Sequence, residues 1–189
     1  MFDIRHESPL DIPAREALLD RCFGESRLAK TSERLREGRL PAEGLALAAT
    51  RNDELVGTIR LWDVAAGPGR AAVLLGPVAV SPELQGAGIG GKLIREALGR
   101  AADAGHRAVI LVGDEAYYRR FGFGREAVAG LWMPGPVDVA RFLGLELAQG
   151  ALAGARGFVS ATGRRAPLPD FAALLQQAAN EDARRLRAA

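Results

Sequence analysis

A short segment of the chain combines four glycines within six positions, at Gly86, Gly88, Gly90 and Gly91. It follows the apolar run Ala71–Val80, which has the composition of a strand buried on both faces, and it opens an amphipathic helical pattern. Glycine permits positive φ and lets other groups approach the backbone closely. The first amides of a helix also lack partners inside it. The segment therefore predicts a concave surface of N–H donors suited to a pyrophosphate.

Several ligands carry a pyrophosphate, and a dinucleotide is the first alternative. Residues 86–91 match the pattern Gly-x-Gly-x-x-Gly, and Asp114 follows the next expected strand, where a ribose-binding acid could lie. In dinucleotide folds, however, the glycines come directly after the strand, whereas here residues 81–85 intervene. A nucleotide phosphate loop is excluded because Leu93, and not Ser or Thr, follows Lys92. A dinucleotide-binding oxidoreductase thus remains a distant third hypothesis.

A second group of candidate residues lies downstream, in the segment Tyr117-Tyr118-Arg119-Arg120-Phe121-Gly122-Phe123. A tyrosine with a pKa near 10 is protonated at neutral pH and can donate a proton to a leaving group. Each tyrosine could instead be an amphipathic aromatic at the edge of the core, and we favour that interpretation for Tyr117 but not for Tyr118. Arg119 and Arg120 could contact phosphate, but we favour simple solvation for both.

Together, the two segments resemble the GNAT superfamily of N-acyltransferases. The family signature is Gln/Arg-x-x-Gly-x-Gly/Ala after a strand of Val-x-Val-x-Pro character, and Gln85–Gly90 after Val78–Pro82 matches it. The family's aromatic pair before x-x-x-Gly-Phe follows in the same order and at the same separation. The resemblance covers about residues 45–123.

This resemblance implies an α/β (α+β) fold with a mixed, mostly antiparallel, twisted sheet flanked by helices. A central parallel pair of strands, ending at Val80 and Val112, would splay apart. The acyl-CoA-binding domain would span residues 1–130, and residues 131–189 would form an extension packed on the same domain.

The resemblance also implies that acetyl-CoA is the cosubstrate. Pantetheine would lie between the splayed strands and bond to the backbone near Val78 and Val80, while the glycine amides would hold the pyrophosphate. The expected cofactor-binding residues are Val78, Ala79, Val80, Gln85, Gly86, Ala87, Gly88, Gly90 and Gly91.

The implied reaction is direct attack of an amine on the thioester in a ternary complex, with Tyr118 as general acid for the departing thiolate. A backbone N–H near Val80 would stabilise the oxyanion. Glu25 is a weak candidate for the base, since the break between the first two helices lines the acceptor side in the family. Asp63 and Asp114 are weaker candidates, and Asp114 could instead cap a short helix. A non-catalytic acetyl-CoA-binding module is the alternative function.

Hydrophobic periodicity and turn signals predict the elements that position these residues. We expect strands at 2–6, 45–50, 54–62, 71–80, 108–112, 141–147 and 157–161, and helices from Asp11 to Cys22 and at 32–37, 88–104 and 116–121. A last helix, capped by Asp170, carries an apolar stripe that makes a homodimer possible.

Composition narrows the function further. The chain has 189 residues, is 48% hydrophobic, and mixes 25 basic with 23 acidic residues, so no strong field would attract nucleic acid. Cys22 is the only cysteine, and His6 and His106 are the only histidines, so we expect no metal site. No signal peptide or membrane span is evident, and we expect a cytoplasmic protein. The acceptor is expected to be an amine, in the first place on a small molecule. A simple amine, an antibiotic-like molecule, an amino acid and a protein amine all stay open as alternatives.

Overall fold

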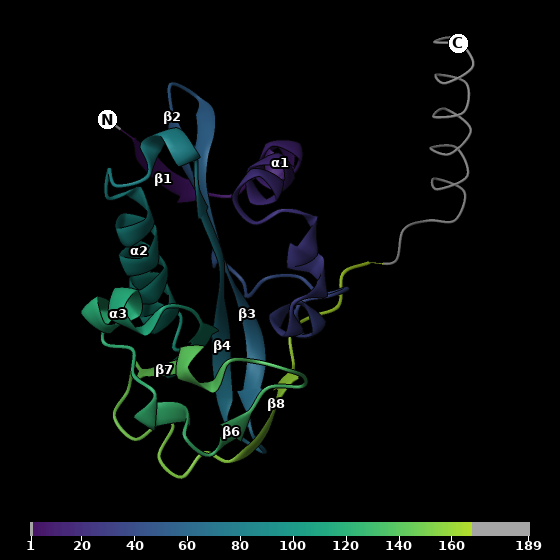
Figure 1. The fold of residues 1–189 in the computed structure, drawn as a ribbon, viewed down its shortest axis with the longest axis vertical. Helices are drawn as coiled ribbons and strands as arrows, with labels where there is room; N and C mark the ends of the chain where they lie inside the picture. Colours follow the sequence, from purple (N-terminus) through teal and green to yellow (C-terminus); the bar gives the residue numbers. More distant parts are fainter. Residues whose placement is uncertain (1, 168–189) are drawn as a thin grey trace, which may run out of the picture.

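The computed structural model describes residues 2–167 as strands and helices around one mixed sheet (Figure 1). The strands are β1 (Asp3–His6), β2 (Ala46–Arg51), β3 (Glu54–Ala66), β4 (Ala71–Val80), β5 (Ala108–Val112), β6 (Leu131–Trp132), β7 (Phe142–Glu146) and β8 (Gly157–Ala161). The α-helices are α1 (Ile12–Phe23), α2 (Ile89–Asp103) and α3 (Glu115–Tyr118). The 3-10 helices are η1 (Pro9–Asp11), η2 (Glu25–Ala29), η3 (Thr31–Leu35), η4 (Pro82–Leu84), η5 (Arg119–Phe121), η6 (Glu126–Val128) and η7 (Val139–Arg141).

The sheet is mostly antiparallel and contains a splayed parallel pair. Its main path runs β1-β2-β3-β4-β5-β7, and β4 and β5 are parallel neighbours. They pair only at Val73 with Val109 and at Leu74 with Ile110, although β4 continues to Val80. The expected mixed sheet with a splayed central pair is therefore confirmed, and the two strands diverge towards their carboxyl ends.

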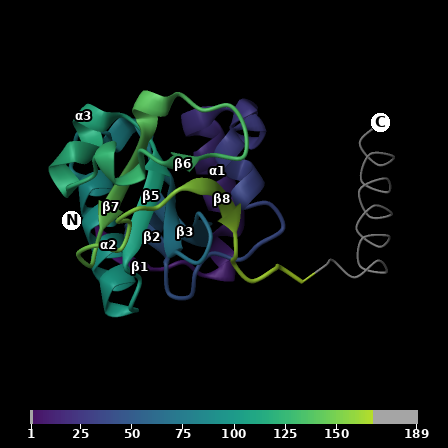
Figure 2. The ribbon, with the colours of Figure 1, turned by 90° about the horizontal axis from the view of Figure 1, so that it is seen from below.

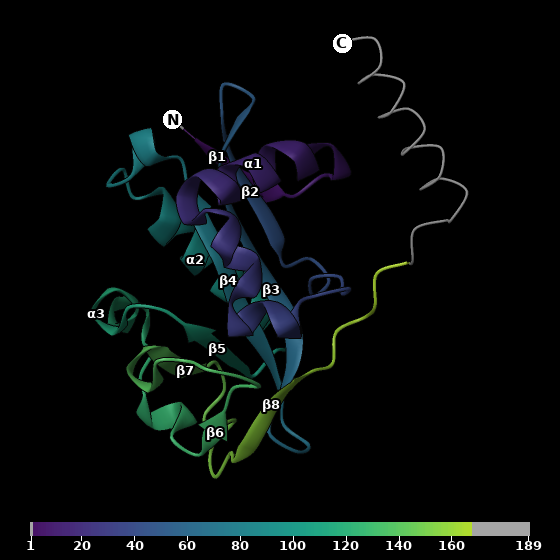
Figure 3. The ribbon, with the colours of Figure 1, turned by 45° about the vertical axis from the view of Figure 1, so that its right-hand side comes forward.

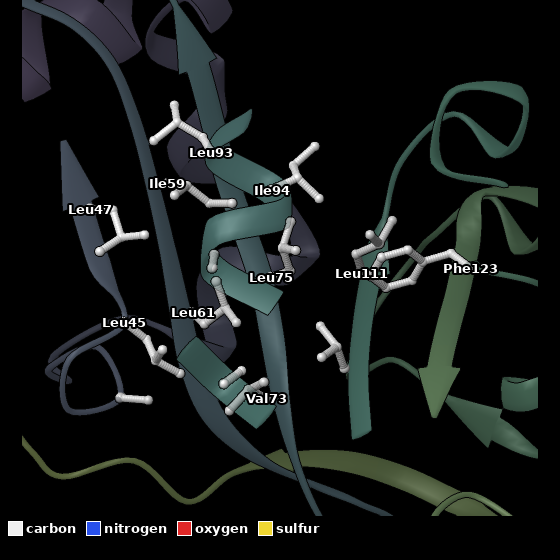
Figure 4. Packing of buried hydrophobic residues seen from close by; sticks show 14 of the residues in the cluster. Leu45, Leu47, Ile59, Leu61, Val73, Leu75, Leu93, Ile94, Leu111 and Phe123 are labelled. Carbon is white, nitrogen blue, oxygen red and sulfur yellow. The ribbon is translucent and has the colours of Figure 1, made fainter. Parts of the chain in front are cut away.

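Helices cover both faces of the sheet. The views in Figures 2 and 3 place α2 on one face and α1, followed by η2 and η3, on the other. The side of α2 that faces the sheet carries its buried residues, namely Ile89, Leu93, Ile94, Ala97 and Ala101. Figure 4 shows Leu93 and Ile94 packed against the leucines and isoleucine of β2 to β4, with Leu111 and Phe123 on the far side of the splay. The alternating side chains of the strands thus anchor α2, and with it the glycine-rich turn.

A glycine in β3 allows this close packing. A Cβ atom on Gly57 would lie 3.0 Å from Cδ1 of Leu93 and 3.2 Å from Cγ2 of Ile89. A larger residue would push the start of α2 away from the sheet. The β2–β3 hairpin is closed by Asn52 and Asp53, which both have positive φ, the backbone conformation of tight hairpin turns.

Some local expectations differ from the structure. β3 continues to Ala66 instead of ending at residue 62, and the helix expected at 116–121 is divided into α3 and the 3-10 helix η5. Asp11 does not cap α1 with its side chain but accepts hydrogen bonds from Ser8 N (2.7 Å) and from Arg5 (2.6 Å). The helix expected at 32–37 is instead the 3-10 helix η3 (Thr31–Leu35). The sequence also gives no sign of β6, a two-residue strand whose periodicity is too short to detect. The helix expected from Asp170 lies outside the described residues.

Part of the segment after residue 130 joins the same sheet. β7 pairs with β5, while β8 pairs with the end of β3, and β6 pairs with β8. The division at residue 130 stays a prediction. In residues 2–167, no helix has the length and apolar character needed to cross a membrane.

Candidate active site

The glycine-rich turn begins where β4 ends and leads directly into α2. After Val80, Ser81 N donates to the carbonyl of Val56 (2.9 Å), and the short helix η4 follows. Gly86 (φ +84°) and Gly88 (φ +81°) adopt left-handed backbone conformations. A residue with a Cβ atom would be strained in this conformation. Gly88 is the N-cap of α2, and no side chain of the described residues caps that helix. Its first amides are therefore left to a ligand or to solvent.

These amides face a cavity of about 390 Å³, which we call the glycine-loop cavity. It is lined by Val80, Leu84, Gln85, Gly86, Gly88, Ile89, Gly90, Gly91, Arg95, Tyr117, Arg120 and Phe121. A Cβ atom on Gly90 would lie 3.4 Å from the Tyr117 hydroxyl and 3.5 Å from Cγ2 of Val80. Glycine at this position therefore keeps the space between the start of α2 and Tyr117 open.

Two arginines add positive charge to this cavity. Arg120 lies with its guanidinium carbon 4.5 Å from the centroid of the Tyr117 ring and donates from Nε to the Tyr117 carbonyl (2.9 Å). Arg95 lies 5.6 Å from the Phe121 ring centroid and donates to the Gly91 carbonyl (3.3 Å). A helix N-terminus with two positioned guanidinium groups is an anion-binding arrangement. Arg120 is exposed, as expected, but it also lines the cavity. Arg119 instead pairs with Glu115 (2.7 Å) and lies outside this lining.

A second cavity, of about 220 Å³, lies where β4 and β5 diverge, and we call it the splay cavity. Its lining residues are Phe23, Arg27, Lys30, Ser32, Glu33, Arg36, Leu74, Leu75, Gly76, Pro77, Val78, Val112, Gly113, Asp114, Tyr118 and Arg141. The strand β4 borders both cavities, since Val78 lines this one and Val80 lines the other. The pairing of β3 with β4 is irregular between Ile59 and Leu61, next to the stretch that forms this wall.

Tyr118 lines the splay cavity, whereas Tyr117 lines the glycine-loop cavity. Tyr118 packs edge-on against two other rings, with centroid-to-centroid distances of 5.1 Å to Tyr117 and 5.8 Å to Phe123. A Cβ atom on Gly113 would lie 2.3 Å from the Tyr118 ring, so only glycine leaves room for this ring. Burial raises the pKa of Tyr118 to about 12, so its hydroxyl stays protonated at neutral pH.

The candidate carboxylates occupy different places. Asp114 caps α3 by accepting from Tyr117 N (2.8 Å), which fixes the helix that carries both tyrosines. Asp63 belongs to β3 and is not part of either cavity lining. Glu25 is the first residue of η2, the helix that precedes Lys30. Glu33, which the sequence did not single out, lines the splay cavity and pairs with Arg36 (2.8 Å).

The cofactor-binding residues expected from the sequence fall mostly in these two linings. Val80, Gln85, Gly86, Gly88, Gly90 and Gly91 line the glycine-loop cavity, and Val78 lines the splay cavity. Ala79 is buried, and it packs with Leu18 and Leu19 of α1 on the opposite face. Ala87 lies in the turn and is part of neither lining. Within the described residues, no group of three or more His, Cys, Asp or Glu could hold a metal ion.

Comparison with known proteins gives concordant matches in sequence and structure. Residues 12–123 match the model of the acetyltransferase (GNAT) family. The chain is 34% identical over 157 residues to the uncharacterized N-acetyltransferase YhbS of Escherichia coli (strain K12), covering 82% of this chain and 93% of that protein.

Two solved structures share the fold. The Escherichia coli GNAT family N-acetyltransferase (YhbS) in complex with CoA has a TM-score of 0.72 and 34% identity, covering 85% of this chain and 89% of the other. A GNAT family acetyltransferase from Brucella melitensis in complex with acetyl-CoA has a TM-score of 0.63 and 31% identity, covering 86% and 96%. The family match spans the turn, α2, β5 and both tyrosines. This chain belongs to the GNAT family of acetyltransferases.

Proposed function

We propose that this acetyltransferase binds acetyl-CoA across the glycine-loop cavity and transfers the acetyl group to an amine in the splay cavity, by direct attack in a ternary complex. The observation that carries the proposal is the adjacency of the two cavities along β4. One offers helix amides and arginines for an anion, and the other contains a protonated tyrosine. The complexes of its relatives with CoA and acetyl-CoA support the same assignment.

In this proposal, the amides of Gly86, Gly88, Gly90 and Gly91, with Gln85 and Ala87 in the same turn, hold the pyrophosphate. Their positive electrostatic potential at the start of α2 stabilises the anion. Arg95 and Arg120 add charge-assisted hydrogen bonds from the rim of the cavity. The pantetheine arm then runs beside the end of β4, where the backbone of Val78, Ala79 and Val80 is next to the splay.

The chemical step needs a neutral amine, a polarised thioester and a proton for the leaving thiolate. The amine attacks the thioester carbonyl, and the new C–N bond gives a tetrahedral oxyanion. Its collapse restores the carbonyl and breaks the C–S bond, which releases the CoA thiolate. A backbone N–H near Val80 stabilises the oxyanion. Tyr118 donates the proton to the thiolate, and its raised pKa keeps that proton available at neutral pH.

The amine must also lose a proton, and Glu33 is our first candidate for the group that accepts it. Its carboxylate lines the splay cavity, and its ion pair with Arg36 holds it there. Glu25, at the start of η2, is the second candidate. Comparing the pH dependence of Glu33→Gln and Glu25→Gln decides between them, because loss of the true base removes the rising limb of kcat/KM.

The test of cosubstrate binding is calorimetric titration with acetyl-CoA, CoA and NADH in parallel. We expect micromolar binding of acetyl-CoA and CoA, and no binding of NADH. Gly88→Glu should lower the affinity for acetyl-CoA about 100-fold, because its carboxylate would place a negative charge at the N-terminus of α2, where the pyrophosphate is proposed to bind. Gly99→Glu is the matched control, since it adds the same charge to an exposed, open position of the same helix.

Failure of acetyl-CoA to bind would refute the proposal, and binding of NADH instead would favour the oxidoreductase hypothesis. Binding of acetyl-CoA without turnover of any amine would favour a non-catalytic binding module. Thermal unfolding of both glutamate variants shows whether each remains folded.

A further inference from the structure

The splay cavity has an uneven charge distribution among the described residues. Four cationic side chains line it, together with two carboxylates. The cations are Arg27, Lys30, Arg36 and Arg141, and the carboxylates are Glu33 and Asp114. If our proposed function holds, this is the place where the acceptor amine binds, so its charges bear on which amines can enter.

Two of these cations and both carboxylates already have partners. Arg27 pairs with Asp20 (2.8 Å) and with Glu16, and Arg36 pairs with Glu33 (2.8 Å). Asp114 accepts the Tyr117 amide as the cap of α3. The ion pairs offset the charges of Arg27, Arg36 and Glu33. Asp114 keeps its negative charge, because the amide that it accepts is neutral, so Lys30, Arg141 and Asp114 together leave a net positive charge at the cavity.

Lys30 and Arg141 remain. Among the described side chains, which do not include that of Glu25, no ion pair involves either of them. Lys30 lies with its ammonium 5.0 Å from the centroid of the Phe23 ring, another residue of the same lining. Arg141 ends η7, and its positive charge partly opposes the rise that burial causes in the pKa of Tyr118. Arg141 is therefore electrostatically coupled to the proposed general acid.

A cavity with uncompensated positive charge discriminates between amines. A second ammonium group on the acceptor would be repelled, whereas a carboxylate would gain charge-assisted hydrogen bonds. Nearby cations also lower the pKa of the reacting ammonium, so more of the amine is neutral and able to attack. The volume of about 220 Å³ lies below the ~300–1,000 Å³ of pockets for drug-sized ligands, which favours a small acceptor.

We propose that the acceptor is a small amine that also carries a carboxylate, as an amino acid does, and that Lys30 and Arg141 bind this carboxylate while the amine faces Tyr118. This inference rests on the proposed function of the splay cavity. It assigns a specificity role to Lys30, the C-cap of η2, and to Arg141, the last residue of η7. Neither residue belongs to the glycine-rich turn or to the segment with the tyrosine pair.

The test is an acceptor panel of matched compounds with the full-length protein and acetyl-CoA. The panel contains the twenty amino acids, their carboxamides and the corresponding decarboxylated amines, with lysine and norleucine as the pair that tests a second ammonium. We expect kcat/KM for the preferred acid to exceed that of its amide by at least about tenfold.

Variants then assign the residues. Arg141→Ala and Lys30→Ala are each expected to lower kcat/KM for the acid by about tenfold and to change that for the amide by less than about twofold. Arg141→Glu should reverse the acid-to-amide preference. Arg51→Ala is the matched control, because it removes the same charge from an exposed residue of β2 that lines neither cavity.

Three outcomes would overturn the inference. The first is acetylation of amides or diamines as efficiently as acids, and the second is an equal loss on acid and amide in the variants. Binding of acetyl-CoA without acetylation of any acid in the panel would also overturn it, while leaving the cosubstrate site intact. Absence of acetyl-CoA binding would remove the proposed function itself, and with it this inference.

Discussion

The two cavities beside the end of β4 are built in different ways. The glycine-loop cavity is formed largely by one continuous segment, residues 80–91, and its main donors are backbone amides, with Arg95 and Arg120 at the rim. The splay cavity collects side chains from η2, η3, β4, β5, α3 and η7, and its character depends on which of them find partners. Backbone amides can bind any pyrophosphate, whereas the side chains of the splay cavity can select one acceptor. The glycine-loop cavity is therefore the feature that we expect family members to share, and the splay cavity is the one that we expect to differ between members with different acceptors.

The separate roles of the two cavities are tested most strongly by removing the hydroxyl of Tyr118. We expect Tyr118→Phe to lower kcat by about 10²- to 10⁴-fold, because the thiolate then departs without its proton donor. The calorimetric Kd for acetyl-CoA should stay within about twofold. The measurement is steady-state kinetics at saturating acetyl-CoA.

Tyr117→Phe provides the contrast, since its hydroxyl faces Gly90 in the other cavity. It should alter acetyl-CoA affinity more than kcat. Equal losses of kcat in the two variants would contradict the separate roles of the tyrosines.

The second test fills the glycine-loop cavity. We expect Gly90→Leu to weaken acetyl-CoA binding about 30-fold, or about 2 kcal/mol, because its side chain would occupy the space between α2 and Tyr117. Gly90→Ala is the matched control, because its Cβ would make only ordinary contacts at 3.4 and 3.5 Å. Similar affinities for the two variants, measured by calorimetry, would show that the ligand does not use this space.

The third test displaces Tyr118 without altering it. Gly113→Ala should lower kcat by about tenfold and destabilise the fold by about 1–3 kcal/mol, because its Cβ would overlap the Tyr118 ring. Denaturant unfolding and steady-state kinetics measure the two effects. A variant as stable and as active as the parent would mean that the ring moves freely.

The smallest expected effect concerns pH. Since burial raises the pKa of Tyr118 to about 12, the acid form persists throughout the range from pH 6 to 10. We therefore expect kcat to rise to a plateau as the general base loses its proton and not to decline before pH 10. A descending limb near pH 8 that disappears in Tyr118→Phe would show that the tyrosine titrates much lower in the ternary complex.

Much of the fold was predictable from the sequence. The bounds of β4, β5 and β8 agree with those expected, and α2 (Ile89–Asp103) lies within one residue of its expected bounds at each end. These elements have strong periodicity or clear breakers. The short helices η2 and η3 and the strand β6 carry too few residues for a period to be seen, and their conformations depend on tertiary packing.

For the site, the sequence alone determined the glycine-rich turn and the tyrosine pair, because helix amides, positive φ and local spacing are properties of contiguous residues. Only the tertiary structure decided which tyrosine faces which cavity, and that Gly113 makes room for Tyr118. It also decided which cations of the splay cavity form ion pairs with the described carboxylates. Lys30 and Arg141 are far apart in the chain, and the ion pairs that neutralise Arg27 and Arg36 exist only after folding.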